Sequence, residues 1–400
     1  MTRQQAPVSV IMSTFNREAY IRAAVDSLLC QTRPPKQILV INDGSTDATK
    51  AILDSYGSRL EVMHQDNSGK SGALNRLMPR ISQDYVWVFD DDDVAFPTFV
   101  ETHLTALAKS PEAAFTYAPV TRALSRPDGT LEPEFVRRIP VTQPCDLLPR
   151  LLERCWLLQQ AMLVRTAAFL SVGGYDSTLL HSEDYDFLLK LARTHSGIHI
   201  DEPALYWRQH GGHRGAAGSR IPARQRREKW YLANQAIFRN VRRDFALWEY
   251  LPHTPPSPQP DRFDQVAALR SRYKVMALHG LWDLALDDLA QLVQQAQGTG
   301  ADAALTAVLT ASLTEPLAVE SLLSNKGYRK RFAEAIHALC TRPQRRVISK
   351  QIYYALLKNW SDISIKRRFY YVRTIGKFLM PRLTVSRSRQ QAAGLGGRRP

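Results

Sequence analysis

The chain has 400 residues, of which 44% are hydrophobic and 23% charged, proportions that are ordinary for a globular protein of two or three domains. Its formal charge of +15 is uneven, because residues 1–218 carry a net −3 and residues 219–400 a net +18, so the two halves are expected to face different partners. No uncharged apolar run reaches about 18 residues and Met1–Pro7 is polar, so neither a membrane-spanning helix nor a signal peptide is predicted.

The first part of the chain alternates apolar strands with helices. Strands are expected at residues 7–12, 37–42, 60–64 and 85–89, and a polar loop and a helix follow each of the first three. Strand–helix–strand units of this length imply parallel strands with right-handed crossovers. The sequence therefore predicts an open α/β sheet, whose ligands gather at the carboxyl ends of its strands.

Four consecutive aspartates, residues 90–93, follow the apolar strand 85–89. Like charges repel, so a folded protein tolerates such a run where a cation lies beside it. Alternation along an extended chain places Asp90 and Asp92 on one side, and oxygen-only ligands suit Mg²⁺ or Mn²⁺. An acidic turn that caps a helix near Pro97 is the alternative, but the buried strand before the run favours a metal–phosphate site.

Three polar loops, at residues 13–16, 43–49 and 90–93, leave strand ends that converge in such a sheet. The carboxylate of Asp43 can accept a hydrogen bond from a nucleobase N–H. A helix cap is an equal alternative for Asp43, since Asp-Gly-Ser-Thr is also a good turn sequence. No GxGxxG follows the first strand and no GxxxxGK[ST] occurs, so neither an NAD-type Rossmann domain nor a P-loop NTPase is predicted.

The region after Pro97 is expected to complete the sheet. Thr14 or Asn16 can cap the first helix of the chain. Residues 120–150, rich in proline and charge, are expected to form an excursion that covers the site. The other expected elements are a helix to about residue 109, strands at 113–119, 161–164, 197–200 and 205–210, a helix ending at Gly173-Gly174, and an amphipathic helix at 185–195.

Three carboxylates, Glu183, Asp184 and Asp186, crowd the first turn of the helix at 185–195. The helix dipole stabilises negative charge there, so they can be N-terminal caps, or one can be a general base aimed into the cleft. His210 follows the last expected strand, where a histidine can ligate a metal, contact a phosphate or be structural.

Six spaced motifs together resemble glycosyltransferase family 2, whose GT-A fold enzymes use nucleotide-diphosphate sugars. They are VSVIMSTFNR (8–17), SLLCQTRPPKQILVINDGSTDAT (27–49), DNSGKSGALN (66–75), YVWVFDDDDVAFP (85–97), GGYDSTLLHSEDYDFLLKLA (173–192) and YWRQH (206–210). The resemblance covers roughly residues 7–215. It implies a GT-A nucleotide-sugar-binding domain with a mixed, mainly parallel sheet flanked by helices.

The resemblance also implies how the donor is bound. Asp43 matches the aspartate that reads the base, and Ser13 lies where a first-loop hydroxyl contacts the nucleotide, with Asn16 among the donor-binding residues of the same loop. Asp90, Asp91 and Asp92 match the DxD motif that binds ribose and a metal, Mn²⁺ or Mg²⁺. Asp92 is the expected direct ligand, with Asp90 and His210 as further candidates, and His210 matches a position near the diphosphate.

Asp184 matches the family's catalytic base, which implies an inverting displacement at the anomeric carbon of the sugar. The charge growing on the departing diphosphate is then stabilised by the metal. Asn42 stands where an aspartate is common, and Leu74 replaces a frequent basic residue, so these departures concern the identity of the donor. The family further implies bacterial surface polysaccharide or glycolipid synthesis on a lipid-linked or glycan acceptor.

The basic half is predicted to be all-α. The expected domains are 1–218, catalytic; 219–260, a basic helix and a proline-rich linker; 261–341, a helical bundle; and 342–400, a basic aromatic segment with a disordered end.

Residues 342–400 hold fifteen Lys and Arg against one acidic residue, Asp362, with aromatic residues interleaved. Such a segment can lie on an anionic membrane, gaining about 1 kcal/mol per basic residue. Nucleic acid attracts the same charges, and a solvated helix face is the plainest alternative, but a sugar transferase ahead of the segment favours the membrane. The four cysteines form no CxxC pair, which favours a reducing compartment, so a cytoplasmic protein peripheral to the inner face of the cell membrane is expected.

Two rival functions use the same residues. A sugar nucleotidyltransferase also needs acidic metal ligands beside a nucleotide, but it releases pyrophosphate instead of a nucleoside diphosphate. A non-catalytic scaffold that binds nucleic acid or membrane is the other rival, and the joint presence of Asp43, Asp92 and Asp184 argues against it.

Overall fold

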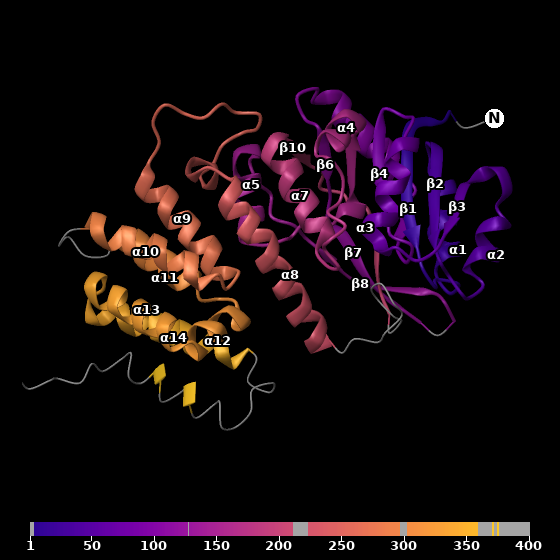
Figure 1. Cartoon of the computed structure of the whole chain (residues 1–400). Helices are drawn as coiled ribbons and strands as arrows, with labels where there is room; N and C mark the ends of the chain where they lie inside the picture. Colours follow the sequence, from indigo (N-terminus) through magenta and orange to yellow (C-terminus); the bar gives the residue numbers. More distant parts are fainter. Residues whose placement is uncertain are drawn as a thin grey trace, which may run out of the picture. The chain divides into compact units, whose positions relative to one another are not determined.

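The computed structural model describes residues 4–126, 128–210, 223–296, 302–358, 370–371 and 374–375 (Figure 1). The chain divides into two compact units, Met1–Leu292 and Val293–Pro400. The first unit contains two β-sheets and the helices around them, and the described part of the second unit is helical.

A seven-stranded mixed sheet of order β10-β6-β9-β4-β1-β2-β3 forms the framework of the first unit. Its strands are β1 (Ala6–Thr14), β2 (Pro35–Asp43), β3 (Glu61–Gln65), β4 (Tyr85–Val88), β6 (Phe115–Tyr117), β9 (Met162–Arg165) and β10 (Gly197–His199). β9 is antiparallel to β4 and β6, and every other adjacent pair is parallel. The predicted α/β class, with a mainly parallel sheet flanked by helices, is confirmed.

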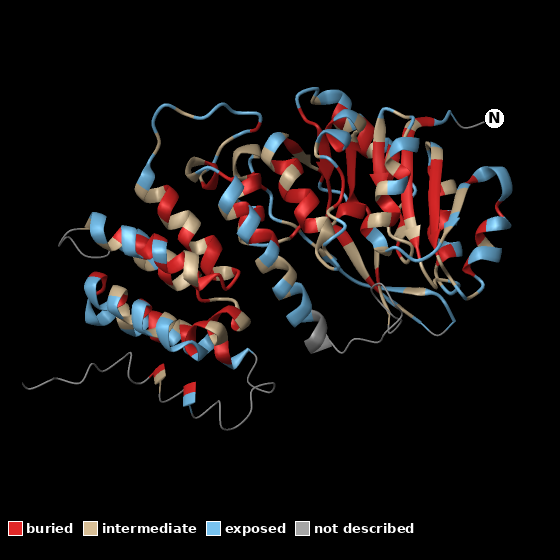
Figure 2. Cartoon of the chain, viewed as in Figure 1, coloured by how far each residue is buried: buried red, intermediate tan, exposed pale blue. Residues whose placement is uncertain are grey.

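The strands of this sheet are apolar because helices cover them. β1 and β2 are buried along most of their length, as Figure 2 shows. Trp87 of β4 is fully buried and stacks on Phe99 with ring centroids 3.8 Å apart. Its indole N–H donates to the carbonyl oxygen of Gln160 at 2.8 Å, so the polar atom of this large side chain is satisfied in the core. The buried strand expected ahead of the aspartates is therefore confirmed.

Helices connect the strands of the large sheet. They are α1 (Ile21–Leu29), α2 (Thr49–Asp54), α3 (Gly69–Leu77), α4 (Phe99–Lys109), α5 (Leu147–Glu153), α6 (Thr166–Ser171) and α7 (Glu183–Thr194), with 3-10 turns at Gly57–Arg59, Met78–Arg80, Pro144–Asp146 and Gln159–Ala161. The expected capping of the first helix by Thr14 or Asn16 is wrong. α1 begins only at Ile21, and the Asn16 side-chain oxygen instead accepts a hydrogen bond from the backbone N–H of Thr46 at 2.8 Å.

A second sheet has the order β5-β11-β7-β8. Its strands are β5 (Val94–Ala95), β7 (Val120–Ser125), β8 (Leu131–Arg137) and β11 (Leu205–Gln209). The expectation that residues 120–150 cover the site is wrong, because they form the β7–β8 pair, a 3-10 turn and α5, and none of those described lines the cavity below. β8 is a mostly exposed edge strand, a place where proline and charge are tolerated.

The first unit continues past the predicted boundary at residue 218 through three helices. They are α8 (Ala223–Asp244), α9 (Gln265–Leu278) and α10 (Trp282–Ala296), with a 3-10 turn at Leu247–Tyr250. Buried Asp288 of α10 accepts hydrogen bonds from Arg242 of α8 and Arg272 of α9 at 3.0 and 2.7 Å. His279 Nε2 lies 3.0 Å from the carbonyl oxygen of Leu152 in α5. The contacts of Asp288 join the three helices to one another, and that of His279 attaches them to the α/β region. The finer domain limits stay a prediction.

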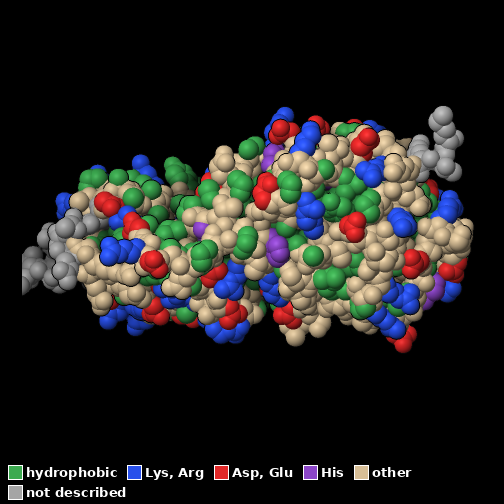
Figure 3. Space-filling view, turned by 90° about the horizontal axis from the view of Figure 1, so that it is seen from above, with side chains coloured by type: hydrophobic (Ala, Val, Ile, Leu, Met, Phe, Trp, Pro, Cys, Tyr) green, Lys and Arg blue, Asp and Glu red, His purple; other side chains and the backbone are tan. Residues whose placement is uncertain are grey.

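The second unit contains α11 (Ala303–Ala311), α12 (Pro316–Ser324), α13 (Lys326–Leu339) and α14 (Arg342–Leu357). α12 packs against α13 and α14, around fully buried residues such as Leu322, Phe332 and Ile352. The expected disordered end lies outside the described residues. No helix in the described part of the chain is long and apolar enough to cross a membrane. On the face seen in Figure 3, acidic and basic side chains are interspersed, with hydrophobic side chains in small groups between them.

Candidate active site

A cavity of about 500 Å³ opens where β1, β2 and β4 end, the edge at which an α/β sheet places its ligands. The first turns of α3 and α7 contribute to its wall. The carboxylate residues that line it are Asp43, Asp90, Asp91, Asp92, Glu183 and Asp184. Carboxylates from three separate parts of the sequence therefore meet in one cavity.

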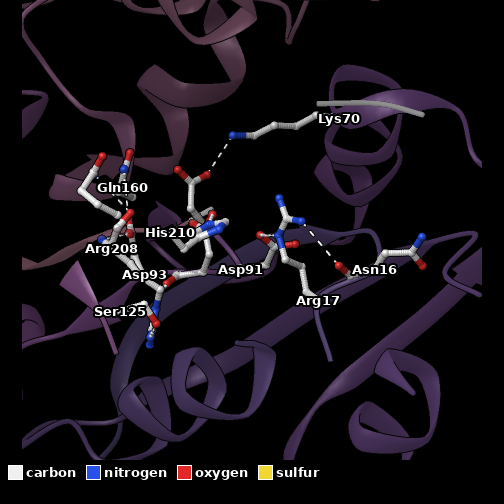
Figure 4. Close-up of polar contacts among 12 residues, drawn as sticks. Asn16, Arg17, Lys70, Asp91, Asp93, Ser125, Gln160, Arg208 and His210 are labelled. Atoms are coloured by element: carbon white, nitrogen blue, oxygen red, sulfur yellow. Dashed lines mark hydrogen bonds and ion pairs between the residues drawn. The ribbon is translucent and has the colours of Figure 1, made fainter. Parts of the chain in front are cut away.

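Asp90 and Asp92 each face a nitrogen from another element. Lys70 Nζ of α3 lies 2.8 Å from Asp90 Oδ1, and His210 Nε2 lies 2.9 Å from Asp92 Oδ2 (Figure 4). Asp90, Asp92 and Asp93 present carboxylate oxygens within 4.8 Å of one another. An all-oxygen set of this size fits a hard divalent ion such as Mg²⁺ or Mn²⁺, so the residues present are compatible with the expected metal.

Asp91 and Asp93 are bound by groups of the surrounding fold. Arg17 Nε lies 3.1 Å from Asp91 Oδ1, whereas Asp93 accepts hydrogen bonds from the Gln160 amide at 3.0 Å and the Arg208 backbone N–H at 2.9 Å. Burial raises the pKa of Asp91 to about 6, against the opposing charge of Arg17. Burial, with the charges of Asp92 and Asp90, raises the pKa of Asp93 well above its ordinary value.

The expected alternation of the four aspartates is wrong in one respect. Residues 91–92 form a turn instead of an extended segment, so the oxygen of Asp93 joins those of Asp90 and Asp92 in a single cluster. The turn also leaves Asp93 only 1% exposed. The Asp93 side chain therefore has a structural role, which is to join this loop to β11 from a buried position.

Asp43 ends β2 and uses both carboxylate oxygens within the protein. Oδ1 accepts from the Ser68 backbone N–H at 2.8 Å and Oδ2 from the Gly69 backbone N–H at 2.9 Å. It therefore caps the start of α3, and not the helix that follows its own strand. Gly44 has φ +82°, and a side chain there would meet the backbone of Asn67, so glycine permits this close approach. Asp43 still lines the cavity, and its contact with a nucleobase stays a prediction.

The two predicted donor-binding residues of the first loop, Ser13 and Asn16, lie in different environments. Ser13 lines the cavity, but Asn16 does not, although its neighbours Phe15 and Arg17 do. Asn16 adopts φ +52°, and its side chain holds the loop that follows β2. Ser182, just before α7, has φ +62°, so the two left-handed non-glycine residues in the described part of the chain both adjoin the cavity.

Asp184 lies in the first turn of α7 and lines the cavity with Glu183. Its Oδ1 accepts from the Tyr185 backbone N–H at 2.8 Å. Burial raises the pKa of Asp184, and the charge of Lys70 opposes the rise. Burial likewise raises the pKa of Glu183 to about 6, and Lys70 Nζ lies 4.0 Å from its Oε1. Asp186, the third carboxylate of this turn, instead pairs with Lys190 at 2.6 Å.

Sequence reasoning missed the cations of the site. Arg17 and Lys70 approach the acidic loop from the β1–α1 connection and from α3 (Figure 4). Both lie inside quoted motifs, Arg17 after Ser-Thr-Phe-Asn and Lys70 after Gly69, and four adjacent aspartates already required positive charge nearby. Trp230 and Asn234 of α8 also line the cavity, and they lie beyond the predicted catalytic domain.

Comparison with known proteins supports the family resemblance that the sequence motifs indicated. Residues 9–153 match the model of the family described as glycosyl transferase family 2. An uncharacterized glycosyltransferase of Rickettsia prowazekii is 29% identical over 203 residues, which cover 50% of this chain and 62% of that protein. Hyaluronan synthase of Pasteurella multocida is 26% identical over 241 residues, covering 58% of this chain and 23% of the synthase.

Among solved structures, S. aureus TarS residues 1–349 in complex with UDP-GlcNAc aligns with a TM-score of 0.49 at 15% identity, covering 93% of this chain and 90% of that one. The chain spans less than two thirds of the length of the curated relatives named above. The family match begins in β1, contains the loops that carry Ser13, Asp43 and Asp90–Asp93, and ends with α5. Residues 9–153 of this chain therefore match glycosyltransferase family 2 over the part that carries these loops.

Proposed function

We propose that the protein is an inverting glycosyltransferase, which moves a sugar from a nucleotide diphosphate to an acceptor hydroxyl. The observation that carries the proposal is that Asp184 lines the same cavity as Asp43 and residues 90–92 of the acidic loop. A direct displacement requires a general base and a donor-binding site in the same cavity. The match of residues 9–153 to glycosyl transferase family 2 supports the reaction class.

In the proposed reaction, the carboxylate of Asp184 takes the proton of the acceptor hydroxyl. The acceptor oxygen forms a bond to the anomeric carbon from the face opposite the diphosphate. The bond from that carbon to the phosphate oxygen breaks, and its electron pair leaves with the nucleoside diphosphate. The raised pKa of Asp184 suits this role, because a more basic carboxylate accepts a proton more readily.

Asp90 and Asp92 are the proposed metal-holding residues, with His210 orienting Asp92 through their 2.9 Å contact. A bound Mn²⁺ or Mg²⁺ supplies positive charge next to the diphosphate. Ser13, Asp43 and Asp91 are proposed to contact the nucleotide from the cavity wall, and Asn16 to support them by holding the neighbouring loop.

A glycan or lipid-linked acceptor in surface polysaccharide synthesis is proposed from the relatives, one of which is named hyaluronan synthase. Attachment to an anionic membrane is proposed from α14, where Val347 and Tyr354 are exposed beside the exposed basic residues Arg346 and Lys350. Vesicles of phosphatidylglycerol should sediment the chain less strongly after Lys350→Glu than after the matched Lys109→Glu on α4. Equal sedimentation of the two variants would remove the membrane proposal.

The function is tested by a thermal-shift screen of UDP- and GDP-sugars with Mn²⁺ or Mg²⁺, followed by product analysis. A true donor should raise the melting temperature of the wild type, and Asp92→Ala should lose the metal-dependent part, because stabilisation follows the ratio of ligand concentration to Kd. Turnover should release a nucleoside diphosphate. Release of pyrophosphate from a nucleoside triphosphate and a sugar phosphate would identify a nucleotidyltransferase instead.

A further inference from the structure

The cavity extends beyond the family-matched segment to a wall made by α8 and the residues before α7. α8 contributes Trp230 and Asn234, which are four positions apart and so lie on one face of the helix. Leu180 and Ser182 contribute from the other segment. This wall adjoins Asp184 and is separate in sequence from the residues assigned to the donor and the metal.

The helix that carries Asp184 also holds α8 in place. Tyr185 of α7 contacts Phe238 of α8 with ring centroids 5.6 Å apart. At the other end of α7, the Arg193 guanidinium lies 4.2 Å from the ring centroid of Phe245 and donates to the carbonyl oxygen of Asp244 at 2.8 Å. The positions of Trp230 and Asn234 are therefore linked to that of Asp184 through packed side chains.

The wall combines exposed apolar surface with a buried polar atom that no described residue satisfies. Trp230 is 48% exposed and Leu180 78% exposed. Asn234 Oδ1 is shielded from solvent and has no hydrogen-bond partner among the described residues. An unsatisfied buried acceptor destabilises the site that contains it, so the site is suited to a ligand that donates a hydrogen bond there.

The indole of Trp230 and the amide of Asn234 complement the apolar C–H face and the hydroxyl-bearing edge of a pyranose ring. The C–H face of the sugar can pack on Trp230, and a hydroxyl at its edge can donate to Asn234 Oδ1. A purely apolar chain would cover Trp230 and Leu180 but would leave the Asn234 oxygen unsatisfied. The observations therefore favour a sugar ring over a lipid tail.

We infer that Trp230 and Asn234 form an acceptor subsite that binds a pyranose ring of a glycan acceptor next to Asp184. The inference rests on the proposed function for the identification of the ligand as acceptor. The assignment of the wall as a sugar site rests only on the chemistry of the residues named. It also gives α8 a role in selecting the acceptor.

The test measures binding by calorimetry to the full chain, with the nucleoside diphosphate that stabilises it and Mn²⁺ present. The probes are octyl β-glycosides of glucose, galactose and N-acetylglucosamine below their micellar concentrations, with octanol as the sugar-free control. At least one glycoside should bind the wild type, and Trp230→Ala should weaken it at least about tenfold, as removal of a tryptophan anchor typically does. Asn234→Ala should weaken it about fivefold. Trp230→Phe should restore most of the binding.

Leu232→Ala is the matched control, since Leu232 is exposed on the same helix and does not line the cavity. It should bind the glycosides within about twofold of the wild type, because its side chain does not line the cavity. Wild-type affinity in both Trp230→Ala and Asn234→Ala, absence of glycoside binding, or equal binding of octanol would overturn the inference. Glycoside binding that depends on Trp230, in a chain that transfers no sugar, would support the sugar subsite and overturn the proposed function.

Discussion

Two groups of carboxylates line one cavity, and they are held in different ways. In the loop 90–93 each aspartate meets its own partner from another element. At the start of α7, Glu183 and Asp184 share one cation, Lys70, which also binds Asp90. The loop is therefore held by four different groups of the surrounding fold, whereas the two carboxylates of the helix turn depend on a single lysine.

The largest expected effect is the loss of transfer rate at the proposed base, Asp184, compared with Asp186 in the same helix turn. Asp184→Asn should lower the transfer rate by about 10²–10⁴-fold, because the amide cannot take the acceptor proton. Donor-induced thermal stabilisation should remain. The control is Asp186→Asn, which removes only the partner of Lys190 and should change the rate by less than about threefold. Equal losses in the two variants would contradict the assignment of the base to residue 184.

The second prediction concerns stability. Asp93→Ala leaves the Gln160 amide and the Arg208 backbone N–H without an acceptor in a buried place. It should lower the free energy of unfolding by about 2–4 kcal/mol, measured by urea denaturation. Asp184→Asn should change that free energy by less than about 1 kcal/mol. A stable Asp93→Ala variant would mean that the acidic loop is not anchored through this residue.

The third prediction concerns the pH dependence of activity and its control by Lys70, the cation that Glu183 and Asp184 share. Burial raises the pKa of Asp184 and Lys70 lowers it, so Lys70→Met should raise the pKa of Asp184 further. A base works when deprotonated, so activity falls as pH drops through its pKa. The acid limb of the kcat/KM profile should therefore move to higher pH, by about one unit. Lys50→Met, which removes a lysine paired with Asp54 outside the cavity, should leave the limb in place.

The smallest expected effect distinguishes the two carboxylates that share Lys70. Glu183→Gln removes a partner 4.0 Å from the lysine and should lower kcat/KM by no more than about fivefold, as expected for a partly exposed ion pair. A loss as large as that of Asp184→Asn, measured in the same assay, would transfer the proposed role of base to Glu183.

Much of the fold could be predicted because its signals are local. The apolar runs of β1, β2 and β4 and the helical spacing of α7 lie within short stretches of sequence. The cap of α1 and the course of residues 120–150 could not, since both depend on distant partners. Asn16 binds the loop after β2, and β7 pairs with β11, more than eighty residues later.

The candidate site was predicted to a similar extent. Motif spacing identified Ser13, Asp43, Asp90–Asp92 and Asp184, which line one cavity. The residues that satisfy or complete them, Arg17, Lys70 and Asn234, were missed, because a lone cation or amide has no distinctive local pattern.

The sequence alone determined where strands end and which carboxylates follow them, because hydrophobic periodicity and chain order are local properties. Only the tertiary structure decided which carboxylates line the cavity and which are held by buried partners. That decision depends on burial and on partners such as Gln160 for Asp93, and the approach of groups far apart in the chain is a property of the packed molecule.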